Sequence, residues 1–187
     1  MLPININNED KKILRETAKQ SIAYGLKNQQ ALSVNLQDFN DTLQTHAASF
    51  VTLNLHHQLR GCIGTLEACQ PLINDVAEHA FAAAFQDPRF PAVTENELDQ
   101  LQIHISVLTP TSPMQFSSEK DLLNQLQPAK DGLILQSGFN KGTFLPSVWK
   151  QLHTPEEFLN HLKIKAGLKA NDWPDDIKVF RYETTVF

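Results

Sequence analysis

Apolar and polar side chains alternate in residues 50–55, which predicts a strand with Val51, Leu53 and Leu55 on one face. A polar break at residues 56–58 follows, and residues 59–65 could return beside this strand as the second arm of a hairpin. The same kind of reasoning predicts further strands at residues 101–108, 132–136, 143–145 and 177–183.

Apolar residues at helical spacing predict three longer helices. The first covers residues 9–26 with Asn8 as its cap, and the second begins at Pro71. The second helix carries many small residues, which suits close packing against a sheet, and we expect Asp75, Glu78 and His79 on its other side. A third helix begins at Thr154-Pro155-Glu156-Glu157 and ends at Gly167. Short helices are expected before Leu98 and in residues 118–126, and residues 31–48 are expected to form a loop.

Length and charge restrict the possible classes of protein. A chain of 187 residues suits one domain, or one domain with two lobes, and the Pro-rich stretch near residues 109–118 is the candidate boundary. The net charge of −5 and the absence of any long basic run argue against nucleic-acid binding. No apolar run approaches the ~20 residues that span a bilayer, and no signal peptide is recognised, so we expect a cytoplasmic protein without membrane contact.

Cysteine and histidine spacing predicts no bound metal or cofactor. The two cysteines, Cys62 and Cys69, match no metal or redox motif and are expected to be reduced. The spacings of the seven histidines match no known site.

The stretch Leu59-Arg60-Gly61-Cys62-Ile63-Gly64 is where we expect chemistry, because a thiol and a guanidinium lie two residues apart between two glycines. Arg60 suits a carboxylate or phosphate, and the glycines allow a bend whose N–H groups could cradle an anion. A nearby cation favours the reactive thiolate of a cysteine. The alternative is that Cys62 is a small buried apolar residue and that the glycines only shape a turn.

Two further positions are candidate ligand contacts. Asp87 and Arg89 flank Pro88 in a stiff loop, where they could pair with each other or present the arginine to a ligand. His104 lies on the polar face of the strand at residues 101–108 and could form a Cys–His arrangement with Cys62. A surface histidine is the simpler interpretation.

The hexapeptide resembles the signature of the AMMECR1 domain, and residues 84–91, 105–110, 143–149 and 165–168 are similar to further blocks of that family. The resemblance implies an α+β fold over residues 1–187, a two-lobed single domain with a largely antiparallel sheet flanked by helices. The length is similar to that of the prokaryotic members called AmmeMemoRadiSam system protein A. Many relatives carry an acidic residue where His104 stands, which weakens any mechanism that needs a Cys–His pair throughout the family.

The resemblance implies a site but no reaction, so whether the protein is an enzyme stays open. The expected function is binding or processing of a small acidic molecule at a cleft lined by the hexapeptide, with Cys62 as the catalytic residue. The alternative is a non-catalytic interaction module, and Memo-like and radical-SAM proteins are the candidate pathway partners. The candidate binding residues are Arg60, Gly61, Gly64, Asp87, Arg89 and His104.

Overall fold

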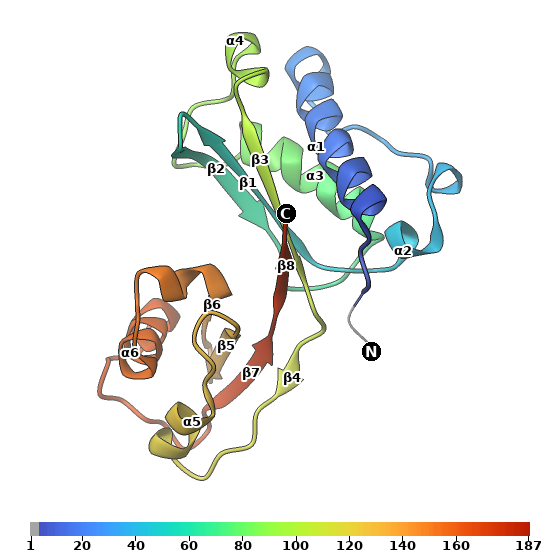
Figure 1. Ribbon diagram of the computed structural model, residues 1–187. Coiled ribbons are helices and arrows are strands. Elements are labelled where there is room, and N and C mark those ends of the chain that lie inside the picture. The colour runs from blue at the N-terminus through green and yellow to red at the C-terminus, as the bar shows by residue number, and fades with distance from the viewer. Residues whose placement is uncertain (1–3) are drawn as a thin grey trace. The chain divides into compact units, whose positions relative to one another are not determined.

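The computed structural model describes residues 4–187, which divide into two compact units (Figure 1). Unit 1 comprises the residues up to Thr109 together with Thr185–Phe187, and unit 2 is Pro110–Thr184. Each unit contains a four-stranded sheet and helices, and the paired strands run antiparallel. The predicted α+β class is therefore confirmed.

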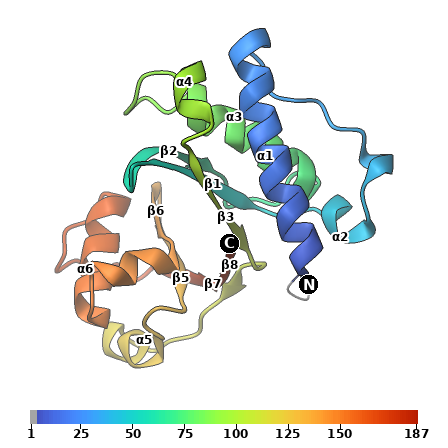
Figure 2. The ribbon, with the colours of Figure 1, turned by 45° about the horizontal axis from the view of Figure 1, so that its top comes forward.

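Unit 1 is a sheet of order β2-β1-β3-β8 with two long helices on one face (Figures 1 and 2). Its connections contain three short helices, so residues 31–48 are not only a loop: Leu43 of α2 is fully buried and fixes this helix to the core. The elements of unit 1 are α1 (Asn8–Asn28), η1 (Leu36–Asp38), α2 (Asp41–Gln44), β1 (Ser49–Leu55), β2 (Gln58–Gly64), α3 (Leu72–Phe85), α4 (Glu95–Leu98), β3 (Gln102–Leu108) and β8 (Thr184–Val186), of which β8 begins one residue before the boundary of the unit.

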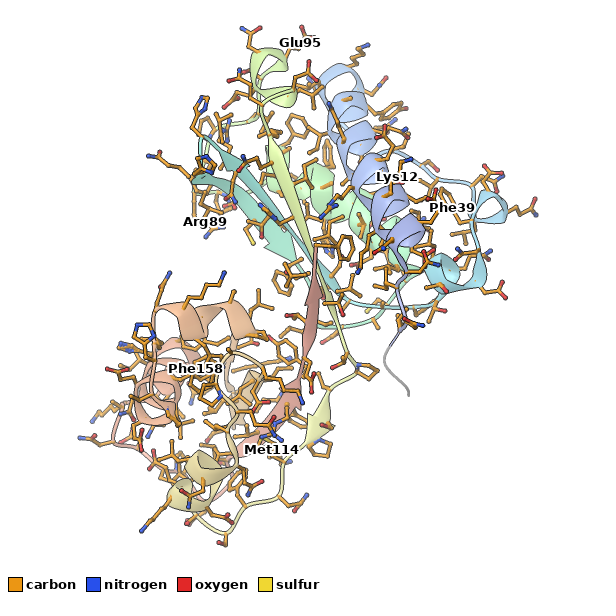
Figure 3. All side chains as sticks on the ribbon, viewed as in Figure 1. Lys12, Phe39, Arg89, Glu95, Met114 and Phe158 are labelled. Carbon is orange, nitrogen blue, oxygen red and sulfur yellow. The ribbon has the colours of Figure 1, made fainter. Side chains whose placement is uncertain are left out.

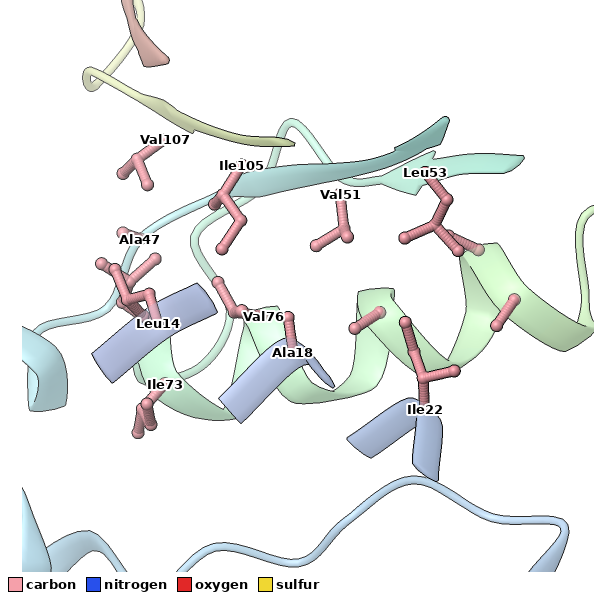
Figure 4. Packing of buried hydrophobic residues seen from close by; sticks show 14 of the residues in the cluster. Leu14, Ala18, Ile22, Ala47, Val51, Leu53, Ile73, Val76, Ile105 and Val107 are labelled. Carbon is pink, nitrogen blue, oxygen red and sulfur yellow. The ribbon is translucent and has the colours of Figure 1, made fainter. Parts of the chain in front are cut away.

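The core of unit 1 lies between the sheet and the helices α1 and α3 (Figure 4). Val51 and Leu53 of β1, and Ile105 beside them on β3, are all fully buried on the helix side of the sheet. Leu14 of α1 and Val76 of α3 pack against them from the other side of the core. The alternation of residues along each strand therefore leaves the opposite face of this sheet for half-exposed and polar side chains.

Three local expectations for the helices are wrong in detail. The cap of α1 is Asn7 rather than Asn8, because Asn7 and Asp10 exchange the two hydrogen bonds of a capping box. Pro71 is the cap residue of α3, which begins at Leu72. Asp75 does not face outward: its carboxylate is buried, accepts a 2.6 Å hydrogen bond from the Ser49 hydroxyl and lies 3.1 Å from His79 Nδ1.

Unit 2 is a sheet of order β4-β7-β5-β6 covered on one face by α5 and α6, with Phe158 of α6 at the centre of its core (Figure 3). The turn of its hairpin is the dipeptide Gly138-Phe139. The second strand begins at Asn140, earlier than the predicted strand at residues 143–145, so Lys141 lies within a strand opposite Gln136. The elements are β4 (Ser112–Pro113), α5 (Glu119–Gln125), β5 (Gly132–Ser137), β6 (Asn140–Phe144), η2 (Pro146–Lys150), α6 (Pro155–Ala166) and β7 (Lys178–Tyr182).

The hairpin of β1 and β2 contains a bulge that decides which way Cys62 faces. Its two-residue turn has both histidines in the left-handed region, with φ of 51° at His56 and 64° at His57. The pairing is regular up to Asn54↔Leu59 and then shifts, so that Leu53 pairs with Gly61 and Thr52 pairs with Cys62. Arg60 is the extra residue. In the unshifted register Cys62 would oppose the buried Val51 and face the helices, because a one-residue slip moves side chains to the other face.

Gly61 lies on the helix side of β2, where no side chain fits. A Cβ atom added to it would stand 2.0 Å from the carbonyl oxygen of Ala83 in α3. This contact is with backbone, which cannot rotate away, so the glycine allows β2 and α3 to pack closely. Its φ is not in the positive region.

We expect Gly61→Ala to lower the free energy of unfolding by about 2–3 kcal/mol, because the new methyl group overpacks the contact between β2 and α3. Chemical denaturation measures the change. Gly138→Ala is the comparison variant, since its added Cβ comes no nearer than 4.0 Å to Asp176 and costs only the strain of its φ of +54°, about 1 kcal/mol. Equal losses in the two variants would show that the contact with Ala83 does not limit packing.

Candidate functional site around Cys62

The Cys62 thiol is half-buried and lies on the face of the unit 1 sheet that the helices do not cover. Its Sγ is 3.2 Å from the Thr52 hydroxyl oxygen, and either atom can donate the proton. Thr52 and Cys62 are directly opposed, and both backbone polar groups of Cys62 are bonded on the side away from β1. This is the narrow type of antiparallel pair, in which opposed side chains come closest.

Two side chains of the loop after α3 form hydrogen bonds with the backbone N–H and carbonyl of Cys62 at the outer edge of β2. The Asp87 carboxylate accepts a 2.9 Å hydrogen bond from the Cys62 N–H, and Arg89 Nη2 donates a 3.1 Å hydrogen bond to the Cys62 carbonyl. Arg89 also donates through Nε and Nη2 to Asp87, at 2.9 and 2.6 Å. The ion pair therefore occupies the place that a neighbouring strand would take, which protects an edge strand from pairing with another chain.

The electrostatics of this pair favour the charged forms. The hydrogen bond from Arg89 holds the pKa of Asp87 well below its usual value of 3.8, although burial acts in the other direction, and the N–H groups of Cys62 and Arg89 lower it further. The pKa of Arg89 is raised, chiefly by its hydrogen bond to Asp87, and the negative charge that a Cys62 thiolate would carry adds to this effect. Asp87 is 4% exposed, whereas the Arg89 side chain is 55% exposed.

Arg60 anchors the bulge rather than pointing into open solvent. Its guanidinium donates to both carboxylate oxygens of Glu97, at 2.7 and 3.1 Å. It also donates to the carbonyl oxygens of Pro91 and Ala92. The hydrogen bond from Arg60 lowers the pKa of Glu97 from 4.5 to about 2, with a smaller contribution from Thr94. With these partners, the Arg60 side chain is only 11% exposed. It connects β2 to the loop between α3 and α4.

The glycines of the hexapeptide serve packing within the protein itself. A Cβ on Gly64 would lie 2.4 Å from the Ser49 carbonyl oxygen and equally close to the Phe50 ring, and the φ of Gly64, like that of Gly61, is not positive. The Cys62 N–H donates to Asp87. The backbone groups expected to cradle an anion are thus engaged at Cys62, and the close approach that the glycines allow is to neighbouring backbone and side chains.

His104 lies across β1 from the thiol. It pairs with Thr52 in the β1–β3 ladder, so Cys62, Thr52 and His104 form one row across three neighbouring strands, and His104 is exposed. The sequence analysis missed Thr52 and Glu97. Alternation did place Thr52 away from the apolar face of its strand. The bulge that sets it opposite Cys62 is formed by Arg60, which binds Glu97, a residue distant in sequence.

Two grooves, one in each unit, lie away from the hexapeptide. A groove of about 570 Å³ in unit 2 is formed by two segments, residues 113–118 and residues 173–180. A smaller groove of about 240 Å³ lies between α1 and Phe39. Within residues 4–187, no three metal-binding side chains (His, Cys, Asp or Glu) gather closely enough to hold a metal ion. No helix in this part of the chain is both long and apolar enough to cross a membrane.

The family of the chain follows from comparison with known proteins. The model of the AMMECR1 family matches residues 15–187, so the chain belongs to the AMMECR1 family, as the sequence resemblance predicted.

Relatives of the chain support this assignment over nearly its whole length. Protein MJ0810 of Methanocaldococcus jannaschii is 36% identical over 156 residues, which cover 81% of this chain and 78% of that protein. A protein of Methanothermobacter thermautotrophicus is 34% identical and covers 97% of this chain and 95% of its own length. The crystal structure of the uncharacterized protein PH0010 from Pyrococcus horikoshii matches with a TM-score of 0.88 at 32% identity, covering 97% of this chain and 92% of that one.

Acid should weaken unit 1 through Asp87 and Glu97. Because their folded pKa values lie below the usual 3.8 and 4.5, the stability they contribute is complete above those values and is lost as the pH falls through the folded pKa. We expect Asp87→Asn to cost about 2 kcal/mol at pH 7, as for a buried hydrogen-bonded charge, and the difference from the wild type to shrink towards pH 2.

Urea denaturation at pH 7, 5, 4 and 3 measures this difference. The control is Asp99→Asn, which removes an exposed surface pair with Lys19 and should change the free energy of unfolding by no more than about 0.5 kcal/mol. A constant gap between Asp87→Asn and the wild type across this pH range would contradict the assignment.

Proposed function

We propose that the protein binds a small acidic molecule on the sheet face that carries Cys62, and that the Cys62 thiol is the group that reacts with it. In this proposal Arg89 binds the anionic group of the molecule. The protein would act in the cytoplasm, in a pathway that also contains Memo-like and radical-SAM proteins, without a cofactor of its own.

One observation carries the proposal: a half-exposed guanidinium is held by hydrogen bonds at the backbone of the residue that carries the half-buried thiol. Arg89 uses Nε and Nη2 for Asp87 and Cys62, and its Nη1 donates no hydrogen bond within residues 4–187. The Phe90 ring lies 5.4 Å from the guanidinium and supports one of its faces (Figure 3 shows Arg89 beside β2). A fixed arginine with a donor to spare is suited to a carboxylate or phosphate.

The geometry changes the roles expected of the other residues. Arg60 and the two glycines shape the strand, while Asp87 orients Arg89 and fixes the Cys62 backbone. Direct contact with the ligand is left to Cys62, Arg89, Thr52 and His104.

A non-catalytic interaction module is the second candidate, and the structure favours it less. Among the described residues of the hexapeptide and the loop at residues 86–91, the only large apolar side chain that is exposed is Leu59, at 43%. Single exposed apolar residues are normal on protein surfaces, whereas docking sites present a contiguous patch.

The proposal predicts that Cys62 selects an anionic alkylating agent. Iodoacetate and iodoacetamide are similar in size, but only iodoacetate carries a carboxylate. In a Cys69→Ser background we expect the ratio of the iodoacetate rate to the iodoacetamide rate to exceed that of a free thiol several-fold. We expect Arg89→Gln to abolish this preference and Arg89→Lys to keep part of it, because lysine retains the charge but not the fork.

Cys69 supplies the matched control, since it is exposed and can be measured alone in a Cys62→Ser background. Its rate ratio should equal that of a free thiol and should not respond to Arg89→Gln. Thermal unfolding of each variant shows whether the loop remains folded without the Arg89–Asp87 pair. A Cys62 thiol that prefers iodoacetamide as strongly as Cys69 does would overturn the proposed anion site.

A further inference from the structure

We propose that Thr52 is a positioning residue that links the Cys62 thiol to His104 and passes a proton between them. The inference rests on the proposed function, because it explains how the thiol of that site becomes the nucleophile. It adds a base, His104, and an intermediary, Thr52, to a site so far described by Cys62 and Arg89.

The sheet itself sets up the relay. Thr52 lies on the central strand β1 and is paired with Cys62 on β2 and with His104 on β3. The Thr52 hydroxyl is already 3.2 Å from the Cys62 sulfur. Directly opposed residues of antiparallel strands have Cβ atoms about 4.5–5.5 Å apart, so rotation of the exposed His104 side chain can bring its ring to the same hydroxyl, with which it forms no hydrogen bond in this structure. A hydroxyl can donate one hydrogen bond while it accepts another.

The proton transfer leaves Thr52 unchanged. The S–H bond of Cys62 breaks as its proton passes to Thr52 Oγ1, and the original hydroxyl proton of Thr52 passes to a ring nitrogen of neutral His104. The products are a thiolate at Cys62 and an imidazolium at His104. No oxidant, reductant or further reactant is required.

The charged groups around the thiol are compatible with this direction of transfer. Arg89 and Asp87 face Cys62 from the loop after α3, and their charges offset each other. Arg60, on the strand of Cys62, is neutralised by Glu97. On α3, Asp75 interacts with His79 and accepts a hydrogen bond from Ser49, the first residue of β1.

The test is the pH profile of Cys62 alkylation by iodoacetamide, a neutral probe, in the Cys69→Ser protein. Thr52→Val removes the hydroxyl at nearly constant volume, and Thr52→Ser restores it. His104→Gln removes the base, and His161→Gln, at an exposed position of α6, is its matched control. Thermal unfolding of every variant checks that the sheet is intact.

We expect Thr52→Val and His104→Gln each to slow alkylation at neutral pH about threefold. A tenfold smaller thiolate fraction would be partly offset by the greater nucleophilicity of a more basic thiolate. Both variants should move the rate profile to higher pH, whereas Thr52→Ser should restore most of the rate that Thr52→Val loses. His161→Gln should match the parent. Because the two residues act in one chain, Thr52→Val/His104→Gln should be no slower than either single variant.

The remaining outcomes overturn the relay. If the two single effects multiply in the double variant, Thr52 and His104 act independently of each other. If Thr52→Val reacts like the parent protein, the hydroxyl has no role, while the anion site of Arg89 is unaffected by that result. A Cys62 thiol that is inert in the parent protein would remove both the relay and the proposed function.

Discussion

Arg60 is the extra residue of the bulge in β2, and the face on which the thiol lies depends on that bulge. The guanidinium binds Glu97 and two backbone carbonyls of the following loop, so it is tied to residues 91–97 while its own strand continues along β1. The shifted register then turns Cys62 to the open face and Gly61 to α3. The ion pair is 11% and 21% exposed at its two side chains, which shields it from the screening that weakens surface pairs.

The same loop makes a second set of hydrogen bonds to β2, from Asp87 and Arg89 to the backbone of Cys62. The contacts at Arg60 and at Cys62 lie on either side of Gly61. Because Gly61 has no side chain, β2 packs closely against α3. The three residues at the centre of the hexapeptide therefore act differently. Arg60 forms the bulge that sets the register of β2 against β1, and Gly61 permits close packing of β2 on α3. Cys62 binds the loop through its backbone N–H and carbonyl, so its side chain is not used for this contact. A residue that is held through its main chain can present its side chain with little freedom of orientation, which is what a reacting group requires.

Sequence patterns predicted the elements of unit 1 well because alternation and helical spacing are local properties. The strand at β3, the helix at α3 and the hairpin around His56 and His57 are all present. Those local patterns could not predict the direction of the Cys62 side chain, because a hairpin without the bulge would have turned it towards the helices. The contact that prevents this joins residues 37 positions apart. Likewise, the motif suggested Arg60 as the ligand clamp, whereas Arg89, which sequence alone could not separate from a local ion pair, is the more exposed of the two.

The position of β8 in the sequence has a consequence for the order of folding. Unit 1 contains β8 at the edge of its sheet, and the Ile105 backbone exchanges hydrogen bonds of 2.8 and 3.1 Å with Phe187. All of unit 2, residues 110–184, is synthesised between β3 and this strand. During translation, β3 is thus an uncovered edge until unit 2 has been made, and such an edge is a site for pairing with other chains. The α+β unit that carries Cys62 begins to form first, and its sheet is completed last.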